Sequence, residues 1–244
     1  MLAVIGGTGM SELTGLELLR RHGSETPLGA ASAGVLHARL AGRELLFLAR
    51  HGHPHRLPPH RVNYRANLWA LKQAGATRIV GVNAVGGIDP SLPTGTMAVP
   101  DQLIDYTHGR DSTFFDGRFR PLQHIDFSWP YTEALRQQLL GAAAECGETV
   151  RAAGVYGATQ GPQLETAAEV ARMARDGCTL VGMTGMPEAV LARELGLEYA
   201  CLALVVNPAA GVVEREISLD EIHAALEQGI GRARRVVTAL LGAG

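Results

Sequence analysis

A dense group of basic side chains around residue 50 is the first feature of the sequence that could do chemistry. Segment 50–61 reads RHGHPHRLPPHR and contains three arginines, four histidines and no acidic residue. Arginine presents a planar fork of N–H donors that suits phosphate, so the segment predicts an anion-binding site. Two alternatives stay open: a solvated basic loop, and a metal site at the alternating His51, His53 and His55. The metal alternative lacks an acidic or cysteine ligand nearby in the sequence.

Two glycine-rich segments could bring backbone N–H groups close to the same anion. Gly6-Gly7-Thr8-Gly9 follows the apolar run 2–5, and Asn83-Ala84-Val85-Gly86-Gly87 follows the run 79–82. Glycine lets a backbone approach a ligand closely, and the Thr8 hydroxyl adds a donor. The first segment has neither the glycine spacing of a dinucleotide fingerprint nor the lysine of a P-loop. A tight turn without a ligand remains the alternative for it.

A carboxylate occupies a turn between two predicted elements. Glu165 follows Gly161-Pro162 and precedes Thr166, which with Glu169 forms the pattern of a capping box at the start of a helix. Glu165 either meets a ligand at the sheet edge or simply interacts favourably with the helix N-terminus.

Two further segments place polar side chains at strand ends. Thr184 lies in GMTGMPE at 182–188 and could donate a hydrogen bond to an anion, while Met183 could pack against a sugar or belong to the core. Asn207 ends the most apolar run in the chain. A buried amide there must find its partners in a loop or in a ligand.

Short apolar runs alternate with helical patterns and would position these segments. Buried strands are predicted at 2–5, 45–49, 79–82, 179–183 and 200–206. Helices are predicted from the Asn63 cap to Lys72, over 131–146, after the Thr166 cap, and from Ser218 to about Leu241. This alternation predicts an α/β fold with its ligand site where strands end in loops. No linker or repeat divides the chain, so we expect a single domain over 1–244.

Composition excludes several classes of protein. The chain has 244 residues, 22 Lys and Arg against 24 Asp and Glu, and a net charge of −2, so a nucleic-acid binder is not expected. No apolar stretch is long enough for a membrane span, and the N-terminus does not read as a signal peptide, so a cytoplasmic protein is expected. Cys146, Cys178 and Cys201 are scattered and predict neither a disulfide framework nor a zinc site.

The segments together resemble the trimeric purine nucleoside phosphorylase family, and its methylthioadenosine phosphorylase branch most of all. The resemblance rests on IGGTG at 5–9, ARHG at 49–52, VNYRANLWALK at 62–72 and GMTGMPE at 182–188. These segments keep the family's order and spacing across nearly the whole chain. The resemblance implies a three-layer sandwich whose twisted mixed sheet is flanked by helices, and a homotrimer. It also implies attack of phosphate, as co-substrate, on C1′ of a purine nucleoside without a metal or an organic cofactor.

The resemblance also assigns roles to the residues that match the family's motifs. The matching phosphate ligands are Thr8, Arg50, His51, Asn83, Ala84 and Thr184. Position 83 is usually threonine in the family, so Asn83 is a departure. Met183 matches the residue that packs on the ribose, and Asn207 and Ala209 occupy the base-reading loop. Asn207 is the expected catalytic residue, since it can stabilise the departing base. The resemblance assigns no role to His53, His55 or His60.

Departures from the methylthioadenosine branch predict the base. Asn207 and Ala209 stand where that branch carries aspartates, and GPQLETAAE, with Glu165, resembles the 6-oxopurine phosphorylases. An ionised Glu165 accepts a hydrogen bond from N1–H of hypoxanthine, but it would face the bare lone pair of adenine N1. Groups left unpaired by the wrong base can give selectivities of roughly 10⁴–10⁵.

The opposite end of the substrate is predicted from the last helix. Leu219 and Ile222 align with the apolar residues that receive the methylthio group in the thionucleoside branch. The combined expectation is phosphorolysis of S-methyl-5′-thioinosine to hypoxanthine and 5-methylthioribose 1-phosphate. The alternatives are a methylthioadenosine phosphorylase, an inosine/guanosine phosphorylase, and a nucleoside-binding protein without catalysis.

Overall fold

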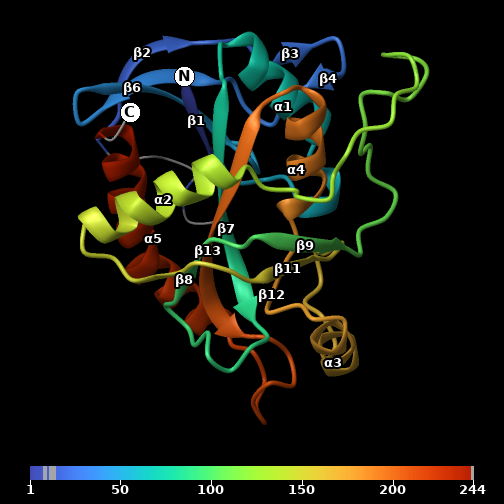
Figure 1. The fold of residues 1–244 in the computed structure, drawn as a ribbon, viewed down its shortest axis with the longest axis vertical. Helices are drawn as coiled ribbons and strands as arrows, with labels where there is room; N and C mark the ends of the chain where they lie inside the picture. The colour runs from blue at the N-terminus through green and yellow to red at the C-terminus, as the bar shows by residue number, and fades with distance from the viewer. Residues whose placement is uncertain (8–9, 11–14, 243–244) are drawn as a thin grey trace.

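An 11-stranded mixed sheet lies at the centre of the computed structural model, which describes residues 1–7, 10 and 15–242 (Figure 1). Its strands are β1 (Leu2–Gly6), β2 (Glu17–Arg21), β5 (Leu36–Leu40), β6 (Arg43–Ala49), β7 (Arg78–Gly87), β8 (Met97–Ala98), β9 (Gln102–Asp105), β10 (Val150–Arg151), β11 (Val155–Ala158), β12 (Leu180–Gly182) and β13 (Glu198–Pro208). A separate ribbon pairs β3 (Glu25–Thr26) with β4 (Gly29–Ala30).

The helices cover both faces of this sheet. They are the 3₁₀ turn η1 (Pro59–Arg61), α1 (Tyr64–Gln73), α2 (Glu133–Glu145), α3 (Ala167–Arg175), α4 (Gly185–Glu194) and α5 (Leu219–Gly242). Helices α2 and α5 pack with one buried apolar cluster, and α1 and α4 pack with another on the opposite face (Figure 1). The predicted three-layer α/β sandwich is therefore confirmed.

The middle of the sheet positions the chain's polar loops. Strands β6, β1, β7 and β13 are parallel neighbours, and β1 is buried along its whole length. Such continuous burial explains why these strands read as apolar runs rather than as alternating patterns. Strand β12 runs antiparallel to β7 and so returns towards the ends of β1 and β6. Residues from four separate strand ends therefore meet at one place.

Most of the predicted elements are present. The five predicted strands correspond to β1, β6, β7, β12 and β13. Strand β12 is shorter than predicted, and the other four are longer, β7 and β13 most of all. The Asn63 side chain accepts a hydrogen bond from Ala66 N at 3.0 Å and caps α1. Thr166 and Glu169 form the predicted capping box of α3. The short or exposed strands at the sheet margins, such as β2 and β8, were not predicted because their sequences carry no continuous apolar run.

Among residues 1–7, 10 and 15–242, none of the helices is long and apolar enough to cross a membrane.

Candidate active site

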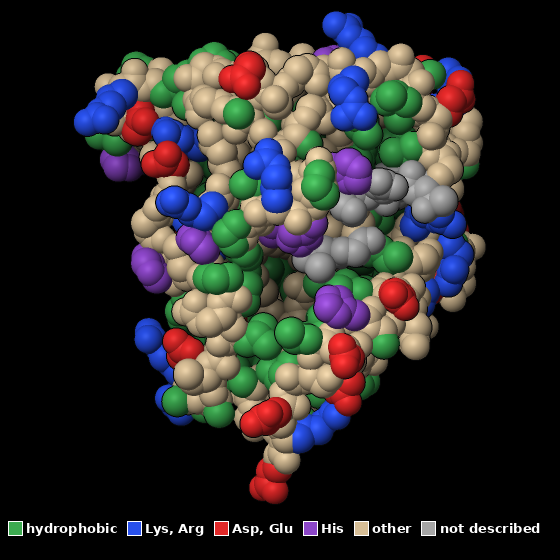
Figure 2. Space-filling view, turned by 180° about the vertical axis from the view of Figure 1, so that it is seen from behind, with side chains coloured by type: hydrophobic (Ala, Val, Ile, Leu, Met, Phe, Trp, Pro, Cys, Tyr) green, Lys and Arg blue, Asp and Glu red, His purple; other side chains and the backbone are tan. Residues whose placement is uncertain are grey.

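A cavity of about 200 Å³ lies where the polar strand ends meet. Nine of the residues predicted from the sequence line it: Arg50, His51, Ala84, Glu165, Met183, Thr184, Asn207, Ala209 and Ile222. The back of the molecule is hollowed where histidine side chains gather above hydrophobic ones (Figure 2). Thr8, the remaining predicted anion donor of the first glycine-rich loop, lies outside the described residues. The structure thus gathers most of the predicted site into one place.

Arg50 follows directly after β6. Its guanidinium group is not free to bind an anion with all of its N–H donors, as the sequence suggested. Its Nε and Nη2 donate to both oxygens of Glu188, and Nη1 donates to the Val82 carbonyl at 3.0 Å. Nη2 also donates to Asn83 Oδ1 at 3.3 Å. Arg50 is 1% exposed and Glu188 is fully buried. Most N–H donors of the Arg50 guanidinium group therefore bond to other groups of the protein, and few remain for a ligand.

Glu188 is a functional candidate that sequence reasoning missed. Its carboxylate also accepts a hydrogen bond from the Tyr199 hydroxyl at 2.9 Å. Burial by itself would lower the pKa of Arg50, but the charge and hydrogen bonds of Glu188 outweigh it and raise that pKa. Glu188 belongs to the GMTGMPE segment, in which only Met183 and Thr184 were predicted to meet a ligand. The signal that could have identified it was the need of a buried arginine for a buried partner.

Asn83 does not line the cavity but positions a residue that does. It is buried, and its Nδ2 donates to Thr184 Oγ1 at 2.8 Å while its Oδ1 accepts from Arg50. The Arg50 contact fixes which way the amide points, because guanidinium groups only donate. The Thr184 hydroxyl oxygen accepts from Asn83, so its proton is left to donate elsewhere. In the structure Asn83 thus contacts Thr184, which lines the cavity, and does not line the cavity itself.

His51 is held in one orientation by its own loop. Its Nδ1 lies 2.8 Å from the Leu57 carbonyl oxygen, and its ring stacks on His55 with centroids 4.5 Å apart. Burial, followed by the charge of Arg50, lowers the pKa of His51 to about 4, although the bond to Leu57 opposes this shift. His51 is therefore neutral at pH 7. Among the described residues, no group of three or more His, Cys, Asp or Glu side chains is arranged to hold a metal ion.

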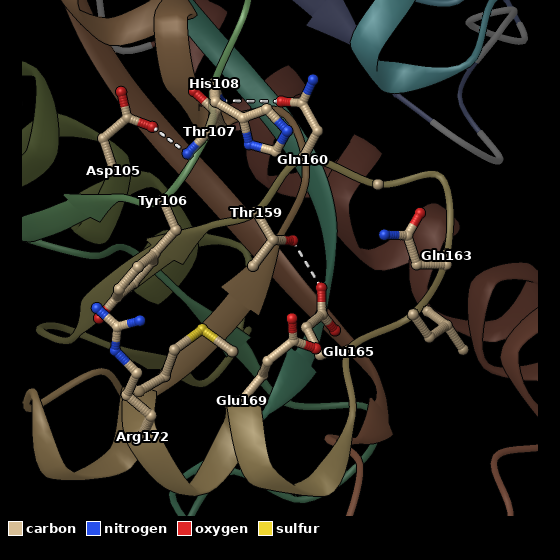
Figure 3. A pocket seen from close by; sticks show the side chains of 13 residues that line it. Asp105, Tyr106, Thr107, His108, Thr159, Gln160, Gln163, Glu165, Glu169 and Arg172 are labelled. Atoms are coloured by element: carbon tan, nitrogen blue, oxygen red, sulfur yellow. Dashed lines mark hydrogen bonds between the residues drawn. The ribbon is translucent and has the colours of Figure 1, made fainter.

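Glu165 lines both the cavity and an adjoining pocket of about 450 Å³, whose lining side chains are drawn in Figure 3. The Thr159 hydroxyl points at it and donates to Oε1 at 2.6 Å. Among the described residues, Oε1 has this hydrogen-bond partner and Oε2 has none, which leaves Oε2 as an acceptor. Thr159 is a further positioning residue that the sequence did not reveal.

Arg110 connects the segments that carry Glu165 and Met183. Its Nη2 donates to the carbonyls of Thr159 and Gln160, and its Nη1 donates to the carbonyls of Met183 and Met186. One guanidinium group therefore fixes two loops that enter the cavity from different strands. Arg110 lies in the long segment between β9 and α2, where nothing in the sequence pattern distinguished it.

Asn207 reaches the cavity through an irregularity in β13. The pairing register with β7 shifts between Val205 and Asn207, so that Asn207 lies opposite Gly86. Bulges of this kind re-aim a side chain at the end of a strand. Asn207 is buried, and its Nδ2 donates to the Pro208 carbonyl at 2.7 Å. Its Oδ1 and second N–H remain to meet a ligand.

The apolar end of the cavity differs from the prediction. Ile222 lines it, but Leu219 does not: as the first residue of α5 it lies beyond the cavity, with 64% of its surface exposed. Leu226, one helical turn after Ile222, lines the cavity instead. Leu219 lies on the same face of α5 as these two residues but at the very start of the helix, so Ile222 and Leu226 are the residues of α5 that line the cavity.

Comparison with known proteins agrees with this geometry. The model of the phosphorylase superfamily matches residues 1–242, and the chain belongs to that family. A probable S-methyl-5′-thioinosine phosphorylase of Pseudomonas syringae pv. tomato is 57% identical over 99% of this chain and 98% of its own length. The 6-oxopurine nucleoside phosphorylase of Pyrococcus furiosus is 40% identical over 91% of this chain and 84% of its own length. The methylthioadenosine phosphorylase of Schistosoma mansoni in complex with adenine superposes with a TM-score of 0.94 at 29% identity, covering 99% of this chain and 90% of that one.

Proposed function

We propose that this phosphorylase cleaves S-methyl-5′-thioinosine with phosphate to give hypoxanthine and 5-methylthioribose 1-phosphate. The observation that carries the proposal is Glu165, an acceptor held by Thr159 in the same cavity as Arg50, His51 and Thr184. One cavity thus contains a carboxylate that can recognise a base and, in His51 and Thr184, two groups that can bind an oxyanion. The names of relatives that are 57% and 56% identical to this chain agree with the proposal.

The base end favours a 6-oxopurine. Oε2 of Glu165 accepts a hydrogen bond from N1–H of hypoxanthine, whereas adenine offers an unprotonated N1 at that position. The amide of Asn207 donates to the oxygen or to N7 of the base. Negative charge that develops on the departing base is stabilised there, in a site that is preorganised by the protein.

The reaction itself is a displacement at C1′ of the nucleoside. A phosphate oxygen forms a bond to C1′ while the C1′–N9 bond breaks and its electron pair leaves with the base. His51 and Thr184 orient the phosphate, and the Arg50–Glu188 pair holds the framework behind them. The protein contributes position and electrostatics rather than a covalent nucleophile.

The apolar end favours a methylthio group over a hydroxyl. Ile222 and Leu226 line this part of the cavity, and no charged side chain of α5 is among the described lining residues. One methyl-sized group in an apolar pocket changes selectivity by about 1–3 kcal/mol. The expected discrimination at this end is therefore moderate, and smaller than that at the base.

The test compares kcat/KM for S-methyl-5′-thioinosine, methylthioadenosine and inosine at saturating phosphate. We expect the first substrate to exceed the second by roughly 10²-fold or more and the third by roughly 10–200-fold. A preference for methylthioadenosine would contradict the role of Glu165, and a preference for inosine would contradict the apolar end. Absence of any phosphate-dependent release of base would contradict phosphorolysis itself.

Replacing Thr159 by valine tests how the Glu165 carboxylate is held. The change removes one hydroxyl at nearly constant volume, so the carboxylate loses the partner of Oε1. We expect kcat/KM for S-methyl-5′-thioinosine to fall by roughly 10-fold, with the preference over methylthioadenosine reduced. Thr113→Val is a matched control, because Thr113 donates to the Glu194 carboxylate at 2.7 Å outside the cavity. An unchanged base preference in Thr159→Val would show that Glu165 does not need this bond.

The proposal extends to a homotrimer in the cytoplasm. The resemblance of the sequence to the trimeric purine nucleoside phosphorylases supports the trimer. Sedimentation of the purified protein measures the oligomeric state directly.

A further inference from the structure

The loop that carries His51 holds both the backbone and the imidazole ring of this residue. The backbone N–H groups of Arg56 and Leu57 both donate to the His51 carbonyl at 3.0 Å, and the Leu57 carbonyl lies 2.8 Å from His51 Nδ1. A carbonyl oxygen can only accept, so Nδ1 must carry a proton. This leaves Nε2 as the ring nitrogen that His51 offers to the cavity.

Nε2 is a bare acceptor because the ring is neutral. The side chain is buried, the Arg50 guanidinium precedes it in the chain, and the His55 ring lies parallel to it at 4.5 Å. Each of these disfavours protonation of His51 to the positively charged imidazolium. Together they keep the pKa of His51 near 4, and the bond to Leu57 opposes them only in part. Glu165 is the acid among the described lining residues; it accepts a hydrogen bond from Thr159, and the proposed function assigns it to the base.

Thr184 has the opposite polarity in the same cavity. Glu188 orients Arg50, Arg50 donates to Asn83 Oδ1, and Asn83 Nδ2 donates to the Thr184 hydroxyl oxygen. In this chain of hydrogen bonds, each bond determines which group donates in the next. The Thr184 proton is therefore left to donate into the cavity, whereas His51 Nε2 can only accept.

We propose that His51 Nε2 accepts the P–OH proton of bound phosphate, so that the site selects a protonated oxyanion over sulfate. The inference rests on the proposed function and specifies the form of its co-substrate. Inorganic phosphate retains a proton at neutral pH, whereas sulfate is fully deprotonated. A phosphate ion can thus donate to His51 and accept from Thr184 at the same time.

Sulfate would place an oxygen lone pair against the lone pair of Nε2. The two ions are similar in size and shape, so the remaining contacts of the site would not separate them. A buried acceptor left unpaired costs about 1–3 kcal/mol. We therefore expect sulfate to bind roughly 10–100-fold more weakly than phosphate.

The experiment measures binding of phosphate, arsenate and sulfate by calorimetry without nucleoside, and inhibition of phosphorolysis by sulfate in competition with phosphate. Arsenate is larger than phosphate but keeps a proton at neutral pH. We expect it to bind like phosphate and not like sulfate. Wild-type protein that binds sulfate as tightly as phosphate would overturn the proposal.

Variants at His51 test whether this residue causes the discrimination between phosphate and sulfate. In His51→Gln the amide can turn its N–H towards a sulfate oxygen, so the ratio of sulfate to phosphate dissociation constants should fall at least about 10-fold. His51→Asn is a second variant, because its amide can keep the bond to Leu57 while removing the acceptor at Nε2. His37→Gln makes the same exchange on β5, where His37 pairs with Glu44, and should keep the wild-type ratio.

Failure of the proposed role of His51 can be distinguished from failure of the proposed function. If both His51 variants fold, as judged by thermal unfolding, and keep the wild-type ratio, His51 does not read the proton. If anions are discriminated as expected but no nucleoside is cleaved, the proposed function fails while the reading of the oxyanion stands.

Discussion

Glu188→Gln is expected to destabilise the protein by about 3–5 kcal/mol, although it changes no atom that lines the cavity. Glu188 is fully buried and compensates the charge of Arg50, which is 1% exposed. Removing the carboxylate charge leaves a buried guanidinium without a counter-ion, and a buried charge cannot recover its hydration. For a chain of this length the loss corresponds to a fall in Tm of roughly 6–20 °C.

The same change is expected to raise KM for phosphate more than KM for the nucleoside. Arg50 holds Asn83 and Asn83 holds Thr184, so an Arg50 released from Glu188 no longer fixes the hydroxyl that donates into the cavity. Activity is measured well below the variant's Tm, so that unfolding does not contribute. A uniform loss of activity with both KM values unchanged would assign Glu188 to stability alone.

Two further variants make the stability measurement specific. Glu221→Gln removes the same charge from the exposed pair with Arg215 and should cost no more than about 1 kcal/mol. Replacing the buried pair by apolar residues, Arg50→Met with Glu188→Leu, should recover much of the stability but not the activity. If Glu188→Gln is no more destabilising than Glu221→Gln, the buried pair does not behave as its geometry implies.

Arg50 was predicted as a site residue from the sequence, whereas its partner Glu188 was not. This difference shows which features of the site could be predicted from the sequence. The strand ends that meet at the cavity were predictable, since β1, β7 and β13 are buried on both faces and appear as continuous apolar runs. Local chemistry also predicted the cap of α1 by Asn63 and the capping box of α3. Each of these signals lies within a few residues of the element that it defines.

Pairings between distant residues were not predictable in this way. Glu188 lies 138 residues from Arg50, and Arg110 bonds to backbone carbonyls that carry no sequence signal. From the sequence, the Arg50 guanidinium group was therefore expected to be available to an anion. In the fold it donates to both oxygens of Glu188 instead. Leu219 was chosen by alignment of a helix start, and only the packed helix shows that Leu226 lines the cavity while Leu219 does not.

The largest change in selectivity is expected from Glu165→Gln. Thr159 donates to Oε1 at 2.6 Å, and a donated bond favours the amide orientation in which oxygen faces Thr159. The amide N–H₂ of the variant then takes the position of Oε2, where it opposes N1–H of hypoxanthine but pairs with N1 of adenine. We expect the ratio of kcat/KM for S-methyl-5′-thioinosine to that for methylthioadenosine to fall by roughly 10²–10⁴-fold.

The double variant Thr159→Val with Glu165→Gln separates orientation from charge. Without the Thr159 hydroxyl the amide can turn either of its ends to the base, so it should accept both nucleosides with similar kcat/KM. The single variant is expected to prefer methylthioadenosine instead. If both variants keep the wild-type preference, the base is read by Asn207 and not by Glu165. If both lose it equally, the charge of Glu165 matters but its orientation by Thr159 does not.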